Sequence, residues 1–319
     1  MTGLAAAFVS ILAGAVPVAE HVSIPAGGVV LAATLHLPAS TTPRPAVVLV
    51  HGSGPGTRDQ LQDETSALTA LGLAVLAYDK RGAGDSTGDW TSSSLADLAA
   101  DARAALAWVR KHPDVDAGRA GYWGVSQAGW VLPEAAKRSD PAFLIIVSGG
   151  GLDPEAVERH QYLGKLEHAG ASEQALAAAR TLLDQYFGYL RDGSGYEELM
   201  SAVQRLRPEP WFTALGLSRV IPRPERRAAW AWVADLDAGA QVKSLRVPTL
   251  VLLGRIDPLM PVDSTRDAWQ RNPCDGCGPE VIVVGNAGHG LRSGPHGGPL
   301  VPEFTRTTER WLRDIGVLP

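Results

Sequence analysis

The sequence has little cysteine, little net charge and no apolar run long enough to cross a membrane. Two of its 319 residues are cysteines, and the formal net charge is −5 at pH 7. This weakly acidic balance gives no reason to expect nucleic acid or an anionic membrane as a partner. With 45% hydrophobic and 20% charged residues, the composition is that of a soluble globular protein. The length is ordinary for an α/β enzyme with an inserted subdomain.

The two cysteines, Cys274 and Cys277, lie in a turn-rich segment. A zinc ribbon needs a second cysteine pair, and a thioredoxin-like redox site needs a strand-to-helix context, so neither is supported. We expect no metal site here. A disulfide that closes a small loop is the expected arrangement in an exported protein. Two free surface thiols are the alternative.

The N-terminal region has no lysine or arginine before Arg44. Residues 4–19 are nearly all apolar, but they are too few to span a bilayer. They end in small residues suited to cleavage after Ala15 or Ala19. We therefore expect residues 1–19 to be a signal peptide of an exported protein, either periplasmic or secreted. The absence of positive charge argues against this, and the alternative is a buried N-terminal element of a cytoplasmic protein.

Apolar strand-like segments alternate with helical segments along most of the chain. Continuous apolar runs such as Pro45–Val50 are typical of strands buried on both faces. This alternation predicts a parallel sheet with helices on both faces, whose site lies beyond the carboxyl ends of the strands. The expected strands are 21–24, 29–37, 45–50, 73–78, 120–123, 142–147, 249–254 and 281–284, and the expected helices are 61–71, 95–112 and 127–138.

One strand-to-helix turn carries a serine between small residues, in the sequence GVSQAG. A serine on such a sharp turn requires small residues two positions before and after it. Gly124 and Ala128 meet this requirement. Glycine is usual in place of Ala128, and we expect the neighbouring Gly129 to make the extra methyl group tolerable. The motif predicts Ser126 as a nucleophile and the backbone N–H of Gln127 as a donor to an oxyanion.

A glycine-rich loop, His51–Gly56, directly follows the strand at 45–50. An oxyanion needs two N–H donors, and the loop after this strand normally supplies the second. We expect that donor to be Ser53, with Gly54 as the alternative. A plain turn or a phosphate-binding loop are other interpretations, although the Gly-Lys-Ser/Thr of a P-loop is missing.

Glycines also follow the strand at 73–78. The Gly-x-Gly at residues 82–84 is only part of a dinucleotide fingerprint, because the third glycine is missing and no helix is expected to begin there. We instead expect Asp79 and Arg81 to have a structural role, tying down the loop backbone and each other near the site.

Two polar residues follow the last two expected strands. Asp257 comes just after the strand at 249–254, and His289 just after the strand at 281–284. Above the edge of a parallel sheet both would meet Ser126. His289 would then accept the serine proton, and Asp257 would fix the imidazole tautomer and stabilise its charged form.

Each of these two assignments has a rival. His296 also follows Asp257, but it lies in a Gly/Pro-rich loop rather than just after a strand. Asp153, shortly after the strand at 142–147, is the competing acid. The other interpretation of either aspartate is a helix N-cap or a turn residue.

Residues 151–242 fit neither half of this pattern. They contain helical segments and an aromatic-rich part, so we expect a helical cap inserted after the sixth strand. The aromatic side chains would line an acyl or alcohol pocket, or alternatively form the small core of the cap itself. The helical segments are 154–169, 172–191 and 196–206, and the aromatic residues are Trp211, Phe212, Trp230 and Trp232.

The ordered motifs HGSGPGTRD, YDKRGAGDSTG, GVSQAGW, LLGRIDPLMP and NAGHG resemble the α/β-hydrolase superfamily. They are most similar to its bacterial serine hydrolases of the lysophospholipase-like and dipeptidyl-aminopeptidase-like esterase group. The resemblance implies a mostly parallel eight-stranded sheet formed by residues 20–150 and 243–319, with the cap at 151–242. It also implies that no metal and no organic cofactor take part.

The same resemblance implies a function. It carries over Ser126, Asp257 and His289 as the catalytic triad, and Ser53 with Gln127 as oxyanion donors. The expected activity is a serine carboxylic ester hydrolase that forms an acyl-enzyme with a small-molecule ester. The alternatives are a serine peptidase or amidase of the same fold, and a non-catalytic binding protein built on it. The sequence gives no indication of the oligomeric state.

Overall fold

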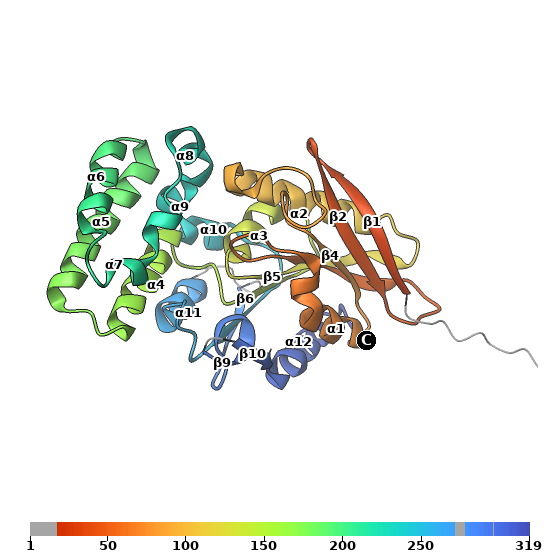
Figure 1. Ribbon diagram of the computed structural model, residues 1–319. Helices are drawn as coiled ribbons and strands as arrows, with labels where there is room; N and C mark the ends of the chain where they lie inside the picture. Colours follow the sequence, from red (N-terminus) through yellow and green to blue (C-terminus); the bar gives the residue numbers. More distant parts are fainter. Residues whose placement is uncertain (1–17, 272–277, 296) are drawn as a thin grey trace, which may run out of the picture.

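One eight-stranded sheet organises the molecule, with strand order β1-β2-β4-β3-β5-β6-β7-β8 (Figure 1). In this sheet β2 is antiparallel to both of its neighbours, β1 and β4. All the other neighbouring pairs are parallel. The strands are β1 (Val18–Ala26), β2 (Val29–Leu37), β3 (Arg44–Val50), β4 (Ala74–Tyr78), β5 (Val115–Val125), β6 (Leu144–Val147), β7 (Thr249–Gly254) and β8 (Glu280–Val284). The predicted mostly parallel sheet is therefore confirmed.

The structure is a computed structural model that describes residues 18–271, 278–295 and 297–319. Cys274, Cys277 and His296, and nearly all of the predicted signal peptide, lie outside these ranges. No helix in the described ranges is both long and apolar enough to cross a bilayer.

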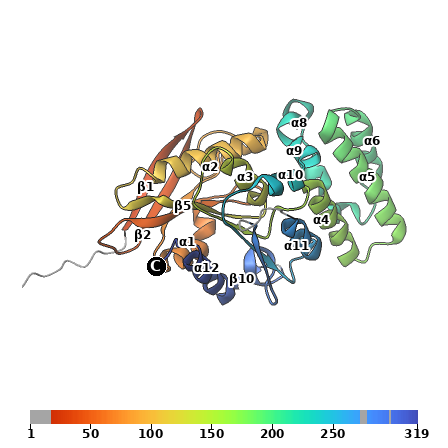
Figure 2. The same ribbon diagram turned by 180° about the vertical axis from the view of Figure 1, so that it is seen from behind.

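Helices cover both faces of the sheet (Figures 1 and 2). Side chains of β3 alternate between two separate cores: Val48 packs on the side of α2, α3 and α10, whereas Val47 and Leu49 pack on the side of α1 and α12. This explains the continuous apolar run of β3, because a strand covered on both faces has no side facing water. These helices are α1 (Gln62–Ala70), α2 (Leu95–Val109), α3 (Ala128–Ala136), α10 (Ala238–Ser244) and α12 (Pro302–Asp314).

The remaining short elements lie around the sheet, apart from one 3-10 helix between α7 and α8. Helix α11 (Val262–Gln270) follows β7, and its Trp269 is buried on the α2 side. After β8 the chain forms a two-stranded hairpin of β9 (Arg292–Gly294) and β10 (Gly297–Leu300). Short 3-10 helices cover Arg58–Leu61, Trp90–Ser92, Leu217–Arg219 and His289–Leu291.

Helices between β6 and β7 form a separate layer beyond one end of the sheet (Figures 1 and 2). We call α4 to α9 the insertion; it has its own apolar core, which includes Phe212 with Trp211 packed against it. Helix α10, by contrast, contributes Ala238 and Val242 to the core beneath α2 and α3. The insertion comprises α4 (Pro154–His168), α5 (Glu173–Asp192), α6 (Tyr196–Leu206), α7 (Phe212–Leu215), α8 (Pro224–Trp230) and α9 (Trp232–Asp235).

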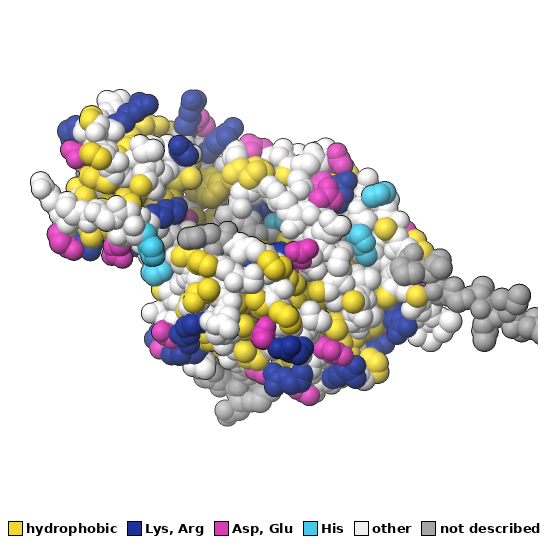
Figure 3. All heavy atoms as spheres, turned by 60° about the horizontal axis from the view of Figure 1, so that its bottom comes forward, with side chains coloured by type: hydrophobic (Ala, Val, Ile, Leu, Met, Phe, Trp, Pro, Cys, Tyr) yellow, Lys and Arg dark blue, Asp and Glu magenta, His cyan; other side chains and the backbone are white. Residues whose placement is uncertain are grey.

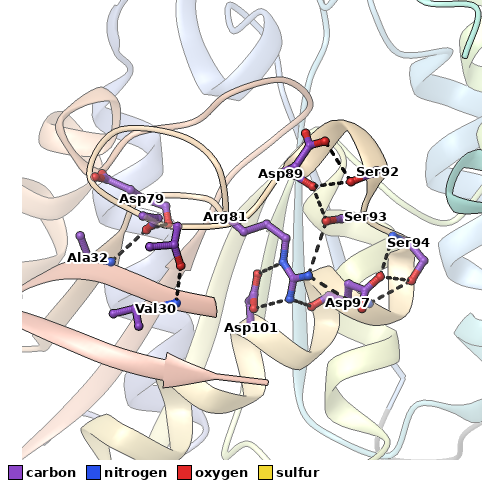
Figure 4. A network of polar contacts seen from close by, with 12 residues as sticks. Val30, Ala32, Asp79, Arg81, Asp89, Ser92, Ser93, Ser94, Asp97 and Asp101 are labelled. Carbon is purple, nitrogen blue, oxygen red and sulfur yellow. Dashed lines mark hydrogen bonds and ion pairs between the residues drawn. The ribbon is translucent and has the colours of Figure 1, made fainter. Parts of the chain in front are cut away.

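The loop after β4 is anchored by two buried charged residues (Figure 4). Asp79 accepts hydrogen bonds from the backbone N–H groups of Arg58 (2.7 Å) and Asp85 (2.9 Å). Arg81 binds Asp101 on α2 through two hydrogen bonds of 2.7 and 2.8 Å. Their predicted structural role is confirmed, but the prediction that they bind each other is wrong, because each pairs with a more distant residue of opposite charge.

Candidate active site

Ser126 occupies the turn between β5 and α3. Its φ of 57° lies in the left-handed region, which a residue with a side chain adopts only when its surroundings enforce it. The Ser126 N–H donates to Val147 O at 2.9 Å, which ties the turn to the end of β6. The strained turn predicted from the sequence is thus present, with the serine at its apex.

Close approaches of the backbone explain the small residues around Ser126. A Cβ atom added at Gly124 would lie 2.5 Å from Ala128 Cβ, so the methyl group of Ala128 fits because Gly124 has none. One added at Gly129 would lie 2.3 Å from Gly150 N in the loop after β6. Gly129 therefore serves a different close contact from the one expected.

Asp257 and His289 form a hydrogen-bonded pair. His289 Nδ1 lies 2.9 Å from Asp257 Oδ2, and Asp257 Oδ1 accepts a hydrogen bond of 2.8 Å from Leu259 N. The Asp257 side chain is 1% exposed and that of His289 is 23% exposed. The buried carboxylate acts as an acceptor for Nδ1, so the proton of the neutral imidazole belongs on Nδ1 and Nε2 is free to accept one.

The loop that carries His289 lies beside the Ser126 turn. Ser126, Asp257 and His289 follow β5, β7 and β8, whose carboxyl ends share one edge of the sheet. A Cβ atom added at Gly290 would lie 3.8 Å from Val125 Cγ2, and Gly290 N donates to Ser148 Oγ at 3.1 Å. Within the described residues, no hydrogen bond joins the Ser126 hydroxyl to His289, whose Nδ1 binds Asp257.

The rival acid is engaged elsewhere. Asp153 occupies the N-cap position of α4, and its Oδ1 accepts a hydrogen bond of 2.8 Å from Ala238 N at the start of α10. The alternative interpretation of this residue as a helix-terminal residue therefore holds. Of the two candidate acids, Asp257 is the one that contacts His289.

The predicted oxyanion donors border the same cavity as Ser126. Ser53 and Gln127 line a cavity of about 50 Å³ together with Ser126, and we call it the inner cavity. In the part of the chain that the structure describes, neither of the two backbone N–H groups donates to a protein acceptor. The Ser53 loop passes close to the serine, since a Cβ added at Gly52 would lie 3.1 Å from Ser126 Cβ.

A buried histidine supports the Ser53 loop. His51 Nε2 donates to Tyr78 O at 2.8 Å, and burial lowers the pKa of His51 to about 4. The imidazole therefore stays neutral and acts as a packing surface. A Cβ added at Gly56 would lie 2.4 Å from His51 Cγ, so glycine is required where the loop folds back over the ring.

A larger cavity of about 720 Å³ adjoins the inner one, and we call it the outer cavity. Four residues line both cavities and so lie between them: Ser53, Glu158, Gln161 and Trp230. Trp232 lines the inner cavity, whereas Trp211 and Phe212 belong to the core of the insertion. Trp230 and Trp232 also pack against that core, so these two residues combine the two roles that the sequence left open.

Basic side chains border the outer cavity. Figure 3 shows Lys and Arg side chains at the edge of the hollow between the insertion and the sheet-bearing part. The cavity is lined by the basic residues Lys165, Arg219, Arg223 and Arg226 and by the acidic residues Glu158 and Glu225. The wall of the cavity therefore carries more positive than negative charge, although the whole chain is acidic.

Three residues near the site were not found from the sequence: Lys80, Ser148 and Glu158. A lysine directly after a buried strand is a signal for Lys80, and the position after β6 is one for Ser148. Nothing local distinguishes Glu158 from other helix-surface glutamates. Across the described residues, no three His, Cys, Asp or Glu side chains are grouped as a metal site requires.

Comparison with known proteins identifies the family. The model of the family described as X-Pro dipeptidyl-peptidase (S15 family) matches residues 27–291, which is most of the chain. The chain belongs to the S15 family. Together with the sheet order, this makes it an α/β-hydrolase-fold serine hydrolase.

Individual relatives of this S15 family member include proteins of known and unknown activity. It is 39% identical over 104 residues to an uncharacterized protein of Mycobacterium tuberculosis, covering 33% of the chain and 36% of that protein. It is 30% identical over 149 residues to esterase EstD of Thermotoga maritima, covering 44% of the chain and 36% of EstD. The alignments thus span about a third of the length of these relatives.

Solved structures share the fold over nearly the whole chain. The esterase Pf2001 of Pyrococcus furiosus superposes with a TM-score of 0.59, covering 93% of this chain and 91% of that one. A thermophilic esterase from Thermogutta terrifontis superposes with a TM-score of 0.56, covering 93% and 99%. Sequence identities of 17% and 21% limit this likeness to the fold.

Proposed function

We propose that the protein is a serine carboxylic ester hydrolase with Ser126 as nucleophile, His289 as general base and Asp257 as the orienting acid. The observation that carries this proposal is the hydrogen bond between His289 Nδ1 and Asp257 Oδ2, which leaves Nε2 as an acceptor on a loop that passes beside the strained Ser126 turn. An imidazole held in this tautomer can accept the proton of a nearby hydroxyl group.

The reaction takes place in two halves. In the first half, the Ser126 hydroxyl gives its proton to His289 Nε2 while its oxygen attacks the ester carbonyl. The backbone N–H groups of Ser53 and Gln127 bind the oxyanion that forms. His289 then gives its proton to the departing alcohol, and water, activated by the same imidazole, releases the acid from Ser126.

The names of the relatives and of the family point to two different substrate bonds, an ester and a peptide or amide. EstD and the superposed Pyrococcus protein are esterases, which supports ester hydrolysis. The description of the matching family, X-Pro dipeptidyl-peptidase, favours a second candidate, cleavage of a peptide or amide bond after proline. The same serine, histidine and oxyanion donors would serve either reaction, because both pass through a tetrahedral oxyanion.

The experiment compares p-nitrophenyl butyrate with an Xaa-Pro p-nitroanilide as substrates of wild type and Ser126→Ala. The ester hydrolase proposal predicts ester turnover by the wild type at a kcat/KM at least tenfold above that for the anilide, and loss of both in Ser126→Ala. Higher turnover of the anilide would replace the ester hydrolase with the peptidase. Undiminished ester turnover by Ser126→Ala would contradict Ser126 as the nucleophile for either reaction.

We also propose that the protein is exported. The support is the apolar segment 4–19 with its small residues at Ala15 and Ala19. Strand β1 begins at Val18, so cleavage after Ala15 would leave the strand whole. The N-terminal sequence of the protein purified from its native host tests this: a chain that still begins at Met1 contradicts export by cleavage.

A further inference from the structure

Lys80 is a buried lysine that neither the proposed triad nor the anchoring of the β4 loop uses. It directly follows β4 and is 5% exposed. Its backbone N–H donates to Gly56 O at 2.9 Å, which fixes it against the loop that carries Ser53. A lysine is rarely buried so fully unless its charge has a partner.

The ammonium group of Lys80 contacts both sides of the proposed oxyanion site. Its Nζ donates to Gln127 Oε1 at 3.0 Å and also to Gly52 O. Gly52 precedes Ser53, and Gln127 follows Ser126 in the chain. One side chain therefore links the two segments whose backbone N–H groups would bind the oxyanion.

The surroundings of Lys80 leave its charge uncompensated. Within the described ranges its Nζ forms no ion pair, and the nearby carboxylates are taken by other cations: Asp101 by Arg81 and Asp79 by Arg58. The neutral His51 and the phenol of Tyr78 also face the small cavity beside it. Burial alone lowers the pKa of Lys80, to about 8. Burying an unpaired charge lowers stability. A lysine kept in such a position therefore indicates a functional role.

We propose that Lys80 is a positioning residue of the oxyanion site, which holds the Ser53 and Gln127 segments at a fixed separation and places a positive charge behind them. This inference rests on the proposed function. Donors fixed before the reaction stabilise the developing oxyanion without reorganising, and a buried cation behind them strengthens the same stabilisation because water does not screen it.

Two effects distinguish this role from simple packing. Loss of the ammonium group weakens binding of the transition state more than binding of the substrate. As a result kcat falls while KM changes little. Loss of its proton removes the charge, so kcat also falls as the pH rises through about 8. The other groups that face this cavity do not produce the decline: His51 is already neutral, burial raises the pKa of the Tyr78 phenol well above its usual value, and Asp101 is bound to Arg81.

The experiment measures kcat and KM of Lys80→Met, Lys80→Arg and wild type for p-nitrophenyl butyrate between pH 6 and 10. Lys111→Met, which changes an exposed lysine in the turn after α2, is the matched control. We expect Lys80→Met to lower kcat about 10- to 100-fold, with KM within about threefold of the wild type, since loss of one oxyanion donor typically costs about 100- to 1,000-fold. We expect the decline of kcat near pH 8 in the wild type and Lys111→Met, but in neither Lys80 variant.

Several outcomes overturn the inference. A Lys80→Met protein with wild-type kcat contradicts the positioning role. If the Lys80 variants fail to fold, the wild type alone still provides a test, because a kcat that stays constant between pH 7 and 9.5 contradicts the role of the charge. The Ser126→Ala variant, measured in the same assay, separates the two proposals. If Ser126→Ala keeps its activity, the proposed function fails. If Ser126→Ala is inactive but Lys80→Met has the wild-type kcat, only the role of Lys80 is refuted.

Discussion

His289 Nδ1 lies 2.9 Å from Asp257 Oδ2, although the two residues belong to loops after different strands. Strands β7 and β8 are neighbours in the sheet, so their carboxyl ends bring the two loops together. Between them, the described part of the chain folds back as α11 and β8. The pairing therefore follows from the topology of a parallel sheet rather than from local sequence.

Substitution Asp257→Asn tests this pair. An amide in place of the carboxylate favours the wrong imidazole tautomer and no longer stabilises the charged form, so kcat should fall about 1,000- to 10,000-fold with little change in stability. Asp153→Asn is the matched control, because that carboxylate binds the start of α10 and should leave kcat within about threefold. Steady-state ester hydrolysis measures both. Equal losses in the two variants would contradict the assignment of the acid.

The close approach of β5 to α3 predicts that a methyl group added at Gly124 lowers stability, and that removing the facing methyl group restores part of the loss. Gly124→Ala places a methyl group 2.5 Å from Ala128 Cβ and should lower the free energy of unfolding by about 1–3 kcal/mol. Adding Ala128→Gly should restore part of the loss, because it removes one of the clashing atoms. Gly118→Ala, an exposed position on the same strand, should cost less than about 0.5 kcal/mol. Urea denaturation measures all four proteins, and a Gly124→Ala protein as stable as Gly118→Ala would contradict this packing.

The buried carboxyl group of Glu158 is expected to make the stability of the protein depend on pH. Its Oε2 is shielded from solvent without a hydrogen-bond partner in the described chain, and burial raises its pKa from 4.5 to about 7. The folded state then holds a proton that the unfolded state loses, so the free energy of unfolding falls as the pH rises from about 4.5 to 7. The shift corresponds to at most about 3 kcal/mol.

Glu158→Gln removes this titration. The stability difference between Glu158→Gln and the wild type should therefore grow in favour of the variant across that pH range. Glu167→Gln, an exposed change on the same helix, should show no such trend. Urea denaturation at several pH values provides the measurement. Parallel stability curves for the wild type and Glu158→Gln would contradict burial of the carboxyl group.

The pair of Arg81 and Asp101 predicts a large loss of stability from a single change. Arg81→Met leaves a 1%-exposed carboxylate without its cation, which should cost about 3–5 kcal/mol. Replacing both residues with Met and Leu should recover much of this loss, because no buried charge then remains. Thermal unfolding of the single and double variants distinguishes the two results. A double variant as unstable as Arg81→Met would show that packing, not charge, anchors the β4 loop.

Much of the fold could be predicted because local sequence determines it. Apolar runs with strand composition marked the strands, and Thr249–Gly254 is found with the predicted bounds. The turn at Ser126 could also be predicted, since its small neighbours reflect a local steric requirement. Candidate residues for the site followed from their positions at strand ends, because a parallel sheet gathers those ends along one edge.

Pairings between distant segments could not be predicted. Arg81 binds Asp101 rather than Asp79, and this choice depends on where α2 packs over the sheet. The bridge from Lys80 to Gly52 and Gln127 requires β3 to lie between β4 and β5, and no short-range pattern encodes this strand order. The burial of Glu158 Oε2, which has no hydrogen-bond partner among the described residues, depends in turn on how α4 packs beside the inner cavity.

The most direct test of Ser126 as the activated nucleophile is to label the purified protein with a fluorophosphonate and locate the adduct by peptide mass spectrometry. We predict a single adduct on Ser126, no labelling of Ser126→Ala, and labelling of His289→Ala that is at least about 100-fold slower than that of the wild type. An adduct on another residue, or a Ser126→Ala protein labelled as fast as the wild type, would contradict the account.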